Sequence, residues 1–264
     1  MSTTSRRNKE FIEREILFVN NAREALKSEG LQALTMEHVA EISHYSKGTI
    51  YKHFTCKEDL YCALTTVSMN YLLRLCKTAQ RYPGRPREQF IALLIAYRLY
   101  SERYPQEFNL VAAARNSDRY EKASNKFREK HEEIQSELDE LSRGVIRAAV
   151  SNGDLVVNDT ISIDMVLFGA WALNQGVQTL SKAPDLIKHL SLPELSKVYL
   201  IQCQTLFDGY QWQPLGTEWD YPDTIQKAYR MISQEHPLSS CINESSSVAY
   251  YTDHEKVTTP EKRH

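Results

Sequence analysis

The 264-residue sequence predicts an all-α protein, and three observations support this fold class. Apolar residues recur at three- and four-residue steps through most of the chain from residue 9 to residue 235. No segment shows the alternation of apolar and polar residues that is typical of a strand. Glycine, proline and Ser/Thr capping signals divide the apolar pattern into separate helices.

The first helix is expected over residues 9–29, behind a polar and mobile start, with Gly30 as a left-handed cap. The segment YPGRPR, residues 82–87, contains two prolines and a glycine and predicts a linker. Pro193 is expected in the first turn of its helix. From residue 236 the chain is Ser/Thr-rich and charged without apolar periodicity, which predicts a disordered tail. Beyond residue 56, helices are expected at about 57–80, 87–103, 106–115, 118–151, 160–180, 193–208 and 222–234.

Residues 35–60 have the pattern of two short helices and the start of a third. Thr35 has a side-chain oxygen that can cap the first of these helices. Residues 43–45 leave room only for a turn before the second helix. The apolar face of the first helix consists of Met36, Val39, Ala40 and Ile42.

Ser46 can cap the second helix, which runs to about Phe54 and turns Ile50 inward. Thr55 and Glu58 have the spacing of a capping box at the start of the third helix. This order is the helix-turn-helix arrangement, whose second helix enters the major groove of DNA. The expected outer side of that helix consists of Lys47, Thr49, Tyr51, Lys52 and His53.

The stretch SKGTIYKHFTCKEDL, residues 46–60, resembles the recognition helix and following turn of TetR-type (TetR/AcrR) transcriptional regulators. The close resemblance extends over about residues 14–64. The turn departs from the family, because Ser43-His44-Tyr45 stands where Ala-Gly-Val is usual; histidine tolerates positive φ better than most residues, so the turn is expected to persist. Further positions that match in the same register are Phe18, Val19, Asn21, Ala22, Ala25, Leu26, Gly30, Thr35, Val39 and Ala40.

The resemblance implies an N-terminal three-helix helix-turn-helix DNA-binding domain at residues 9–60, joined by the helix at about 57–80 to a larger helical effector-binding and dimerisation domain at residues 81–235. It implies a bacterial, cytoplasmic regulator that binds double-stranded DNA as a homodimer. Repression of a palindromic operator, relieved by a small-molecule effector, is the expected action. The chemistry of the side chains assigns phosphate contacts to Thr35, Tyr51, Lys52, His53 and Lys57. It assigns base-edge contacts to Tyr45, Ser46, Lys47 and Thr49, with Gly48 allowing close approach.

Two further sets of residues have alternative interpretations. The helix at 160–180 is apolar nearly all round, which fits a central core helix or a dimer seam shared with the helix at 193–208. The seam interpretation, which the resemblance favours, includes Gly169, Leu173, Gly176 and Leu180. An effector pocket among the middle helices would use the following residues, which also fit an ordinary core: Tyr71, Phe90, Tyr97, Tyr100, Phe108, Trp171, Asn174, Gln175 and Gln178.

Other function classes have little support in the sequence. The net charge is −2, so local basic clusters rather than overall charge would carry DNA contact. Five cysteines lack metal-type spacing, and no cofactor, metal or membrane span is predicted. No nucleophile elbow or phosphate loop is present, so an enzyme is not expected. The rival hypotheses are a helical domain that docks a protein partner and, less favoured, a helical enzyme with a vestigial DNA-binding domain.

Overall fold

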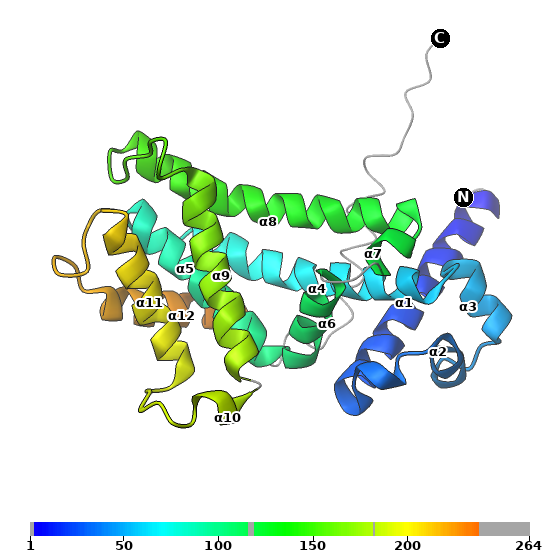
Figure 1. Cartoon of the computed structure of the whole chain (residues 1–264). Helices are drawn as coiled ribbons and strands as arrows, with labels where there is room; N and C mark the ends of the chain where they lie inside the picture. The colour runs from blue at the N-terminus through cyan, green and yellow to red at the C-terminus, as the bar shows by residue number, and fades with distance from the viewer. Residues whose placement is uncertain (1–2, 116–118, 182, 238–264) are drawn as a thin grey trace, which may run out of the picture. The chain divides into compact units, whose positions relative to one another are not determined.

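The computed structural model describes residues 3–115, 119–181 and 183–237, and every regular element in these ranges is helical. The predicted all-α class is therefore confirmed. The elements, labelled in Figure 1, are α1 (Thr3–Glu29), a 3₁₀ turn (Leu31–Ala33), α2 (Met36–Ile42), α3 (Lys47–His53), α4 (Lys57–Gln80), α5 (Pro86–Arg103), α6 (Pro105–Arg115), α7 (Arg119–Lys122), α8 (Asn125–Ser151), α9 (Ile163–Ser181), α10 (Pro184–Ile187), α11 (Leu195–Gly209) and α12 (Tyr221–Glu235).

The chain divides into two compact units that are each discontinuous in sequence. The first contains residues Met1–Arg74 and Tyr100–Ser136, and the second contains Leu75–Leu99 and Glu137–His236. The helices α4, α5 and α8 each pass from one unit into the other. The domain limits expected from the sequence, 9–60 and 81–235, stay a prediction.

The first unit has a core to which both of its segments contribute. Phe18 of α1, Ile50 of α3 and Phe54 after α3 are fully buried. Phe127 of α8 is also buried, and its ring stacks on that of Phe54 with 5.4 Å between centroids. Burial of each such side chain stabilises the fold by roughly 1.5–3 kcal/mol, so the segment after residue 100 is part of what holds α3 in place.

The second unit is built around aromatic side chains from α5, α11 and the loop that follows α11. Phe90 lies edge-on to Phe207, with 5.5 Å between ring centroids, and 5.3 Å from the ring of Trp212. Phe207 and Trp212 are completely buried. The buried residues of α9, in contrast, are few and small, namely Val166, Ala170 and Asn174.

Several boundaries predicted from the sequence are wrong. The expected helix at 118–151 is two helices, because the backbone N–H of Ser124 donates to Asp59 Oδ1 at 2.6 Å and the chain bends there to start α8. The first helix begins at Thr3 rather than residue 9. Pro193 precedes α11, whose N-cap is Glu194.

The remaining expectations of the sequence have mixed outcomes. Gly30 has a positive φ of 82°, which favours glycine, but its ψ of −177° lies outside the left-handed helical region, so the predicted left-handed cap is wrong. The short helix α10 has no counterpart in the sequence analysis. From residue 238 on, the predicted disordered tail lies outside the described residues.

Candidate nucleic-acid interface

The helix α2 begins as its sequence predicts. The side chain of Thr35 accepts a hydrogen bond from the backbone N–H of His38 at 3.1 Å, which satisfies one of the free donors at the helix start. Met36, Val39 and Ala40 are buried in the first unit's core. The opposite side of α2, which carries Glu37 and Glu41, faces solvent.

The turn between α2 and α3 keeps its tight geometry without glycine. His44 has a φ of 57°, which confirms the expected positive value. The backbone N–H of Tyr45 donates to the carbonyl of Ala40 at 3.0 Å, and Asn21 of α1 donates to Ser43 Oγ at 2.9 Å. The turn is thus held from α1 as well as from α2, which fixes the angle at which α3 leaves.

The helix α3 presents a polar surface on one side and a buried apolar surface on the other. Ser46 caps it by accepting from the backbone N–H of Thr49 at 3.2 Å, and its hydroxyl also lies 2.9 Å from that of Thr49. Ile50 faces the core. Of the predicted DNA-contacting residues, those exposed to solvent are Tyr45, Ser46, Lys47, Gly48, Tyr51 and Lys52, while Thr35, Thr49 and Lys57 are half-buried.

Lys47, at the start of α3, forms an ion pair with Glu37 of α2. Their mutual hydrogen bond raises the pKa of Lys47 and lowers the pKa of Glu37. The Lys47 ammonium also lies 5.7 Å from the ring centroid of Tyr51. Lys57, at the start of α4, lies 5.0 Å from the ring centroid of Tyr61, so cations occur at the beginning of both α3 and α4.

The expected outward position of His53 is wrong, because its side chain is 1% exposed. Its imidazole stacks on the ring of Phe11 with 3.8 Å between centroids, and Phe18 lies edge-on to it. Nδ1 of His53 is 3.5 Å from Glu15 Oε2, and Lys126 bonds to both oxygens of that carboxylate. His53 therefore anchors the last turn of α3 to α1 and has no access to a phosphate.

The predicted capping box after α3 is also wrong in its acceptor. Asp59, not Glu58, accepts from both the backbone N–H and the hydroxyl of Thr55, at 2.8 and 2.7 Å. Its second oxygen holds the backbone of Ser124. Burial alone would raise the pKa of Asp59, but the hydrogen bonds from Thr55 and Ser124 lower it below the usual value.

The residues predicted to line an effector pocket are divided between the two units. In the first unit, Tyr71, Tyr100 and Phe108 are buried. The hydroxyl of Tyr100 lies 2.5 Å from Ser68 Oγ, and Ser68 donates to Glu107. In the second unit, Phe90 belongs to the core, Asn174 is buried, Trp171 is exposed, and Tyr97, Gln175 and Gln178 are half-buried. Their joint role in one pocket stays a prediction.

The predicted seam residues all lie on α9 and differ in their surroundings. A Cβ at Gly169 would lie 2.9 Å from Leu206 and 3.1 Å from the Tyr210 hydroxyl of the same chain. Gly169 therefore allows α9 to pack closely on α11. A Cβ at Gly176 would meet nothing within 4 Å, Leu180 is exposed and Leu173 is half-buried.

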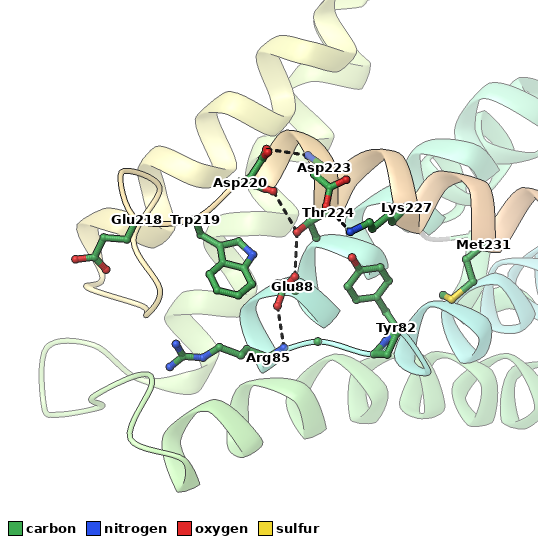
Figure 2. Close-up of a pocket in the computed structure, with 12 residues that line it drawn as sticks. Tyr82, Arg85, Glu88, Glu218, Trp219, Asp220, Asp223, Thr224, Lys227 and Met231 are labelled. Carbon is green, nitrogen blue, oxygen red and sulfur yellow. Dashed lines mark hydrogen bonds and ion pairs between the residues drawn. The ribbon is translucent and has the colours of Figure 1, made fainter.

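The second unit contains a groove that the sequence does not predict (Figure 2). It lies between the segment 82–88 and the segment 218–231 and has a volume of about 960 Å³. For the segment YPGRPR the sequence predicts only a linker. The acidic and aromatic run EWDYPD, residues 218–223, was the available signal in the sequence.

Two negative observations apply to the part of the chain that the structure describes. Within it, no three metal-ligating side chains are grouped closely enough to hold an ion. None of the helices described combines the length and the apolar character that crossing a membrane requires.

Comparison with known proteins gives a match in the region of the capped helices. Residues 18–64 match the model of the family described as bacterial regulatory proteins, tetR family. No curated protein matches the chain in sequence.

Solved structures share the fold. One is a protein with unknown function from Rhodococcus sp. RHA1, with 19% identity and a TM-score of 0.61, covering 75% of this chain and 95% of that one. Another is the TetR family transcriptional regulator PfmR from Thermus thermophilus, with 15% identity and a TM-score of 0.52, covering 72% and 97%. The family match spans α2, the turn and α3, so the helix-turn-helix region of this chain is similar to that of the bacterial regulatory proteins of the tetR family.

Proposed function

We propose that the protein is a repressor that binds a palindromic operator as a homodimer and leaves it when a small molecule binds. The observation that carries the DNA-binding part is the solvent-facing polar side of α3, held at a fixed angle by the caps at Thr35 and Ser46 and by the turn at His44. In this proposal α3 lies in the major groove.

The proposed contacts divide according to chemistry. Lys47, Thr49 and Ser46 at the start of α3 read base edges, Tyr45 assists them, and Gly48 allows the backbone close to the DNA. Lys52 and Tyr51 contact phosphates, together with Thr35 and Lys57. His53 is removed from this set because it is buried.

The dimer is proposed to form through α9 and α11, which lie side by side in Figure 1. Large apolar side chains stand on the solvent side of this pair: Phe168 is 62% exposed and Ile201 57%, with Met165 and Trp171 beside them on α9. Exposed apolar patches mark interaction surfaces. A second copy related by a two-fold axis would cover them in a four-helix bundle, with Gly176, Leu173 and Leu180 in the seam.

A buried polar chain in the first unit supports effector control. Arg23 of α1 donates to Glu107 of α6 at 2.9 Å, and Glu107 accepts from Ser68 of α4, which contacts Tyr100 of α5. A movement of α5 or α6 would therefore be transmitted to α1, because separating these buried hydrogen-bonded groups would cost free energy. The effector must bind the DNA-free conformation more tightly than the DNA-bound one.

The test is to sequence the genomic DNA fragments that the purified protein retains and to footprint the enriched site. We expect protection of two half-sites about one helical turn apart, or a multiple of that spacing, related by two-fold symmetry. Retention of fragments without a shared sequence would overturn sequence-specific binding. Protection of a single half-site by a monomer, with mass from light scattering, would overturn the dimer.

A further inference from the structure

The groove in the second unit has a buried carboxylate in its floor (Figure 2). Glu88 of α5 is 6% exposed. Its two oxygens accept hydrogen bonds from the hydroxyl of Thr224 and from the backbone N–H of Arg85, both at 3.0 Å. A carboxylate has about four acceptor positions, so Glu88 retains capacity for further donors.

Glu88 forms no ion pair with a cationic side chain in the described part of the chain, although Arg85 and Lys227, which are paired with other carboxylates, are near enough to interact with it electrostatically. Its two donors are neutral groups, and the start of α5 supplies only the equivalent of about half a positive charge. Buried charges in proteins are normally paired, because a carboxylate loses its hydration on burial. Gly84 keeps the space beside this carboxylate open, since a Cβ there would stand 2.9 Å from Glu88 Oε2.

The rim of the groove adds to the negative charge. The lining contains four carboxylates and two cations, which gives a formal charge of −2. Both cations are already paired: Arg85 with Asp154, and Lys227 with Asp223 at 2.6 Å. Figure 2 shows the guanidinium of Arg85 directed away from Glu88. The carboxylates of Glu218 and Asp220 have no ion pair with any described residue.

The walls of the groove are suited to an organic cation. The rings of Trp219 and Tyr82 flank Glu88 in the view of Figure 2, and Trp219 is 41% exposed. Aromatic faces attract ammonium groups within about 6 Å of the ring centroid. An inorganic ion fits less well, because no group of three metal ligands exists among the residues described.

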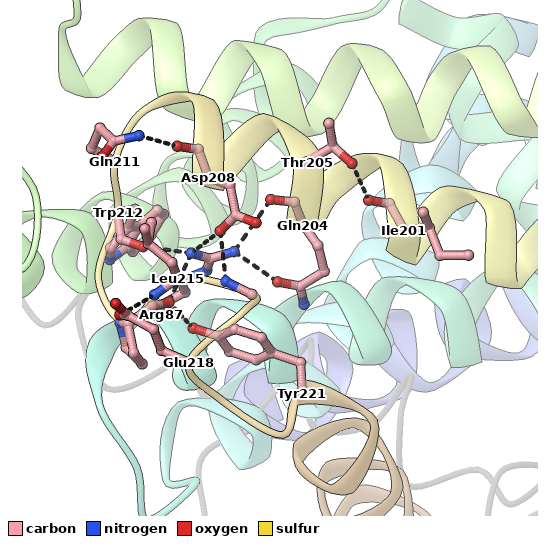
Figure 3. A network of polar contacts seen from close by, with 12 residues as sticks. Arg87, Ile201, Gln204, Thr205, Asp208, Gln211, Trp212, Leu215, Glu218 and Tyr221 are labelled. Carbon is pink, nitrogen blue, oxygen red and sulfur yellow. Dashed lines mark hydrogen bonds and ion pairs between the residues drawn. The ribbon is translucent and has the colours of Figure 1, made fainter.

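The loop that carries Glu218, Trp219 and Asp220 is fixed to the second unit by Arg87 (Figure 3). Arg87 is fully buried, donates to the carbonyl oxygens of Trp212 and Pro214, and pairs with Asp208 at 2.7 Å. The hydroxyl of Tyr221 donates to the same carbonyl of Pro214. The two ends of the loop are thereby held together, so the groove exists before any ligand arrives.

We infer that this groove binds an organic molecule with a primary ammonium group and an apolar or aromatic body. The ammonium donates to Glu88 at the floor, the rim carboxylates of Glu218 and Asp220 add attraction, and the apolar body lies along Trp219. This site is separate from the helix-turn-helix and does not rest on the proposed function, because an amine can bind here whether or not the protein represses a gene.

The experiment uses isothermal titration calorimetry of the full-length protein with 2-phenylethylamine and hexylamine, and with 2-phenylethanol and hexanol as neutral counterparts. We expect both amines to bind and both alcohols to bind at least tenfold more weakly. Added salt should weaken the amines, because they bind through an ion pair. The proposal is overturned if the wild-type protein binds neither amine, or binds each alcohol as well as its amine.

Substitutions test whether the amines bind in the groove. Glu88→Gln keeps an oxygen for the N–H of Arg85, and its amide can donate to the Thr224 hydroxyl, so the helix start is preserved while the charge is lost. We expect amine affinity to fall about tenfold or more, as is usual for the loss of a hydrogen bond to a charged group. Trp219→Leu should lower it several-fold. Asp185→Asn, which removes an exposed carboxylate outside the lining, should leave it unchanged.

Thermal unfolding identifies any variant that does not fold. If Glu88→Gln is unfolded, the double variant Glu218→Gln with Asp220→Asn tests the site instead. This variant is expected to fold, because both residues are exposed and an asparagine at 220 still caps α12. Amine affinity equal to wild type in that folded variant, or in folded Glu88→Gln, would place amine binding elsewhere and contradict the inference. Loss of DNA binding with amine binding intact would contradict only the proposed repressor.

Discussion

The carboxylate of Glu37 on α2 holds the ammonium of Lys47 at the first residue of α3. Lys47 is the cation proposed to contact base edges, so Glu37 neutralises part of the positive charge on the proposed DNA-contacting side of α3. Both side chains are more than half exposed, and such pairs contribute little to folding stability. The pair therefore affects DNA contact more than it affects the fold.

The first prediction is that Glu37→Gln raises DNA affinity. Freed Lys47 can approach a phosphate or a base edge, and a negative charge near the DNA is lost. Affinity for random DNA should rise more than affinity for the operator, and the salt dependence should steepen by about one phosphate contact. Titrations at two salt concentrations measure both. Glu41→Gln, which removes another exposed carboxylate of α2, is the control, and an equal effect there would show that the pair has no special role.

The second prediction distinguishes phosphate contact from base reading. Lys52→Ala should weaken binding to operator and random DNA by similar factors and flatten the salt dependence. Thr49→Ala should instead reduce the discrimination between operator and random DNA. Its backbone N–H still donates to Ser46, so α3 remains capped. Fluorescence titrations on both DNAs provide the comparison, and unchanged affinity in both variants would place the DNA contacts on another surface.

The third prediction concerns the dimer. Gly176→Arg introduces a charged side chain where a Cβ meets nothing within 4 Å, so the isolated chain should fold normally. In a seam formed by α9, a buried unpaired charge would cost several kcal/mol. We expect a folded monomer by circular dichroism and light scattering, with operator affinity strongly reduced.

Gly144→Arg is the matched control for this third prediction. It adds the same side chain at another helical glycine, on α8, whose Cβ position is also open. If both variants dimerise like the wild type, the dimer interface does not include Gly176 of α9. If both are monomers, α8 also contributes to the dimer interface.

The fourth prediction concerns the pH dependence of stability. The pKa of Asp59 is lowered in the folded protein by Thr55 and Ser124, so the unfolded state binds a proton there more readily. Its stabilising contribution is complete above the unfolded value of about 4 and is lost as pH falls through the lower folded value. Asp59→Asn should reduce stability at pH 7 by about 1–3 kcal/mol.

In urea unfolding, this variant should also lose less stability than the wild type between about pH 5 and pH 3. Parallel stability–pH curves for the two proteins would mean that Asp59 ionises alike in the folded and unfolded states. Asp185→Asn, an exposed carboxylate of α10, provides the baseline.

The features that the sequence predicts well depend on neighbouring residues. The caps at Thr35 and Ser46 and the positive φ of His44 each involve groups within a few positions along the chain, so residue type and spacing are sufficient. The burial of His53, in contrast, depends on Phe11 and Glu15 of α1. The apolar pattern of so short a helix as α3 does not indicate that α1 covers the side that carries His53.

Features formed by distant segments could not be predicted in this way. The break between α7 and α8 depends on Asp59, more than sixty positions earlier in the chain. The groove combines residues 82–88 with residues 218–231, and neither segment indicates a binding site alone. Periodicity reports which side of a helix is apolar, but it does not report which other segment covers that side.

The contribution of residues 100–136 to the core around α3 has a consequence for the newly made protein. Phe127 stacks on Phe54, and Cys62 of α4 donates to the carbonyl of Phe127. A nascent chain whose Phe127 is still inside the ribosome cannot complete this packing. At about 5–20 residues per second, translation takes several seconds between α3 and the end of this segment. During that interval the unfinished unit exposes apolar surface to chaperones and proteases, and the packing around α3 is complete only after roughly half of the polypeptide has been synthesised.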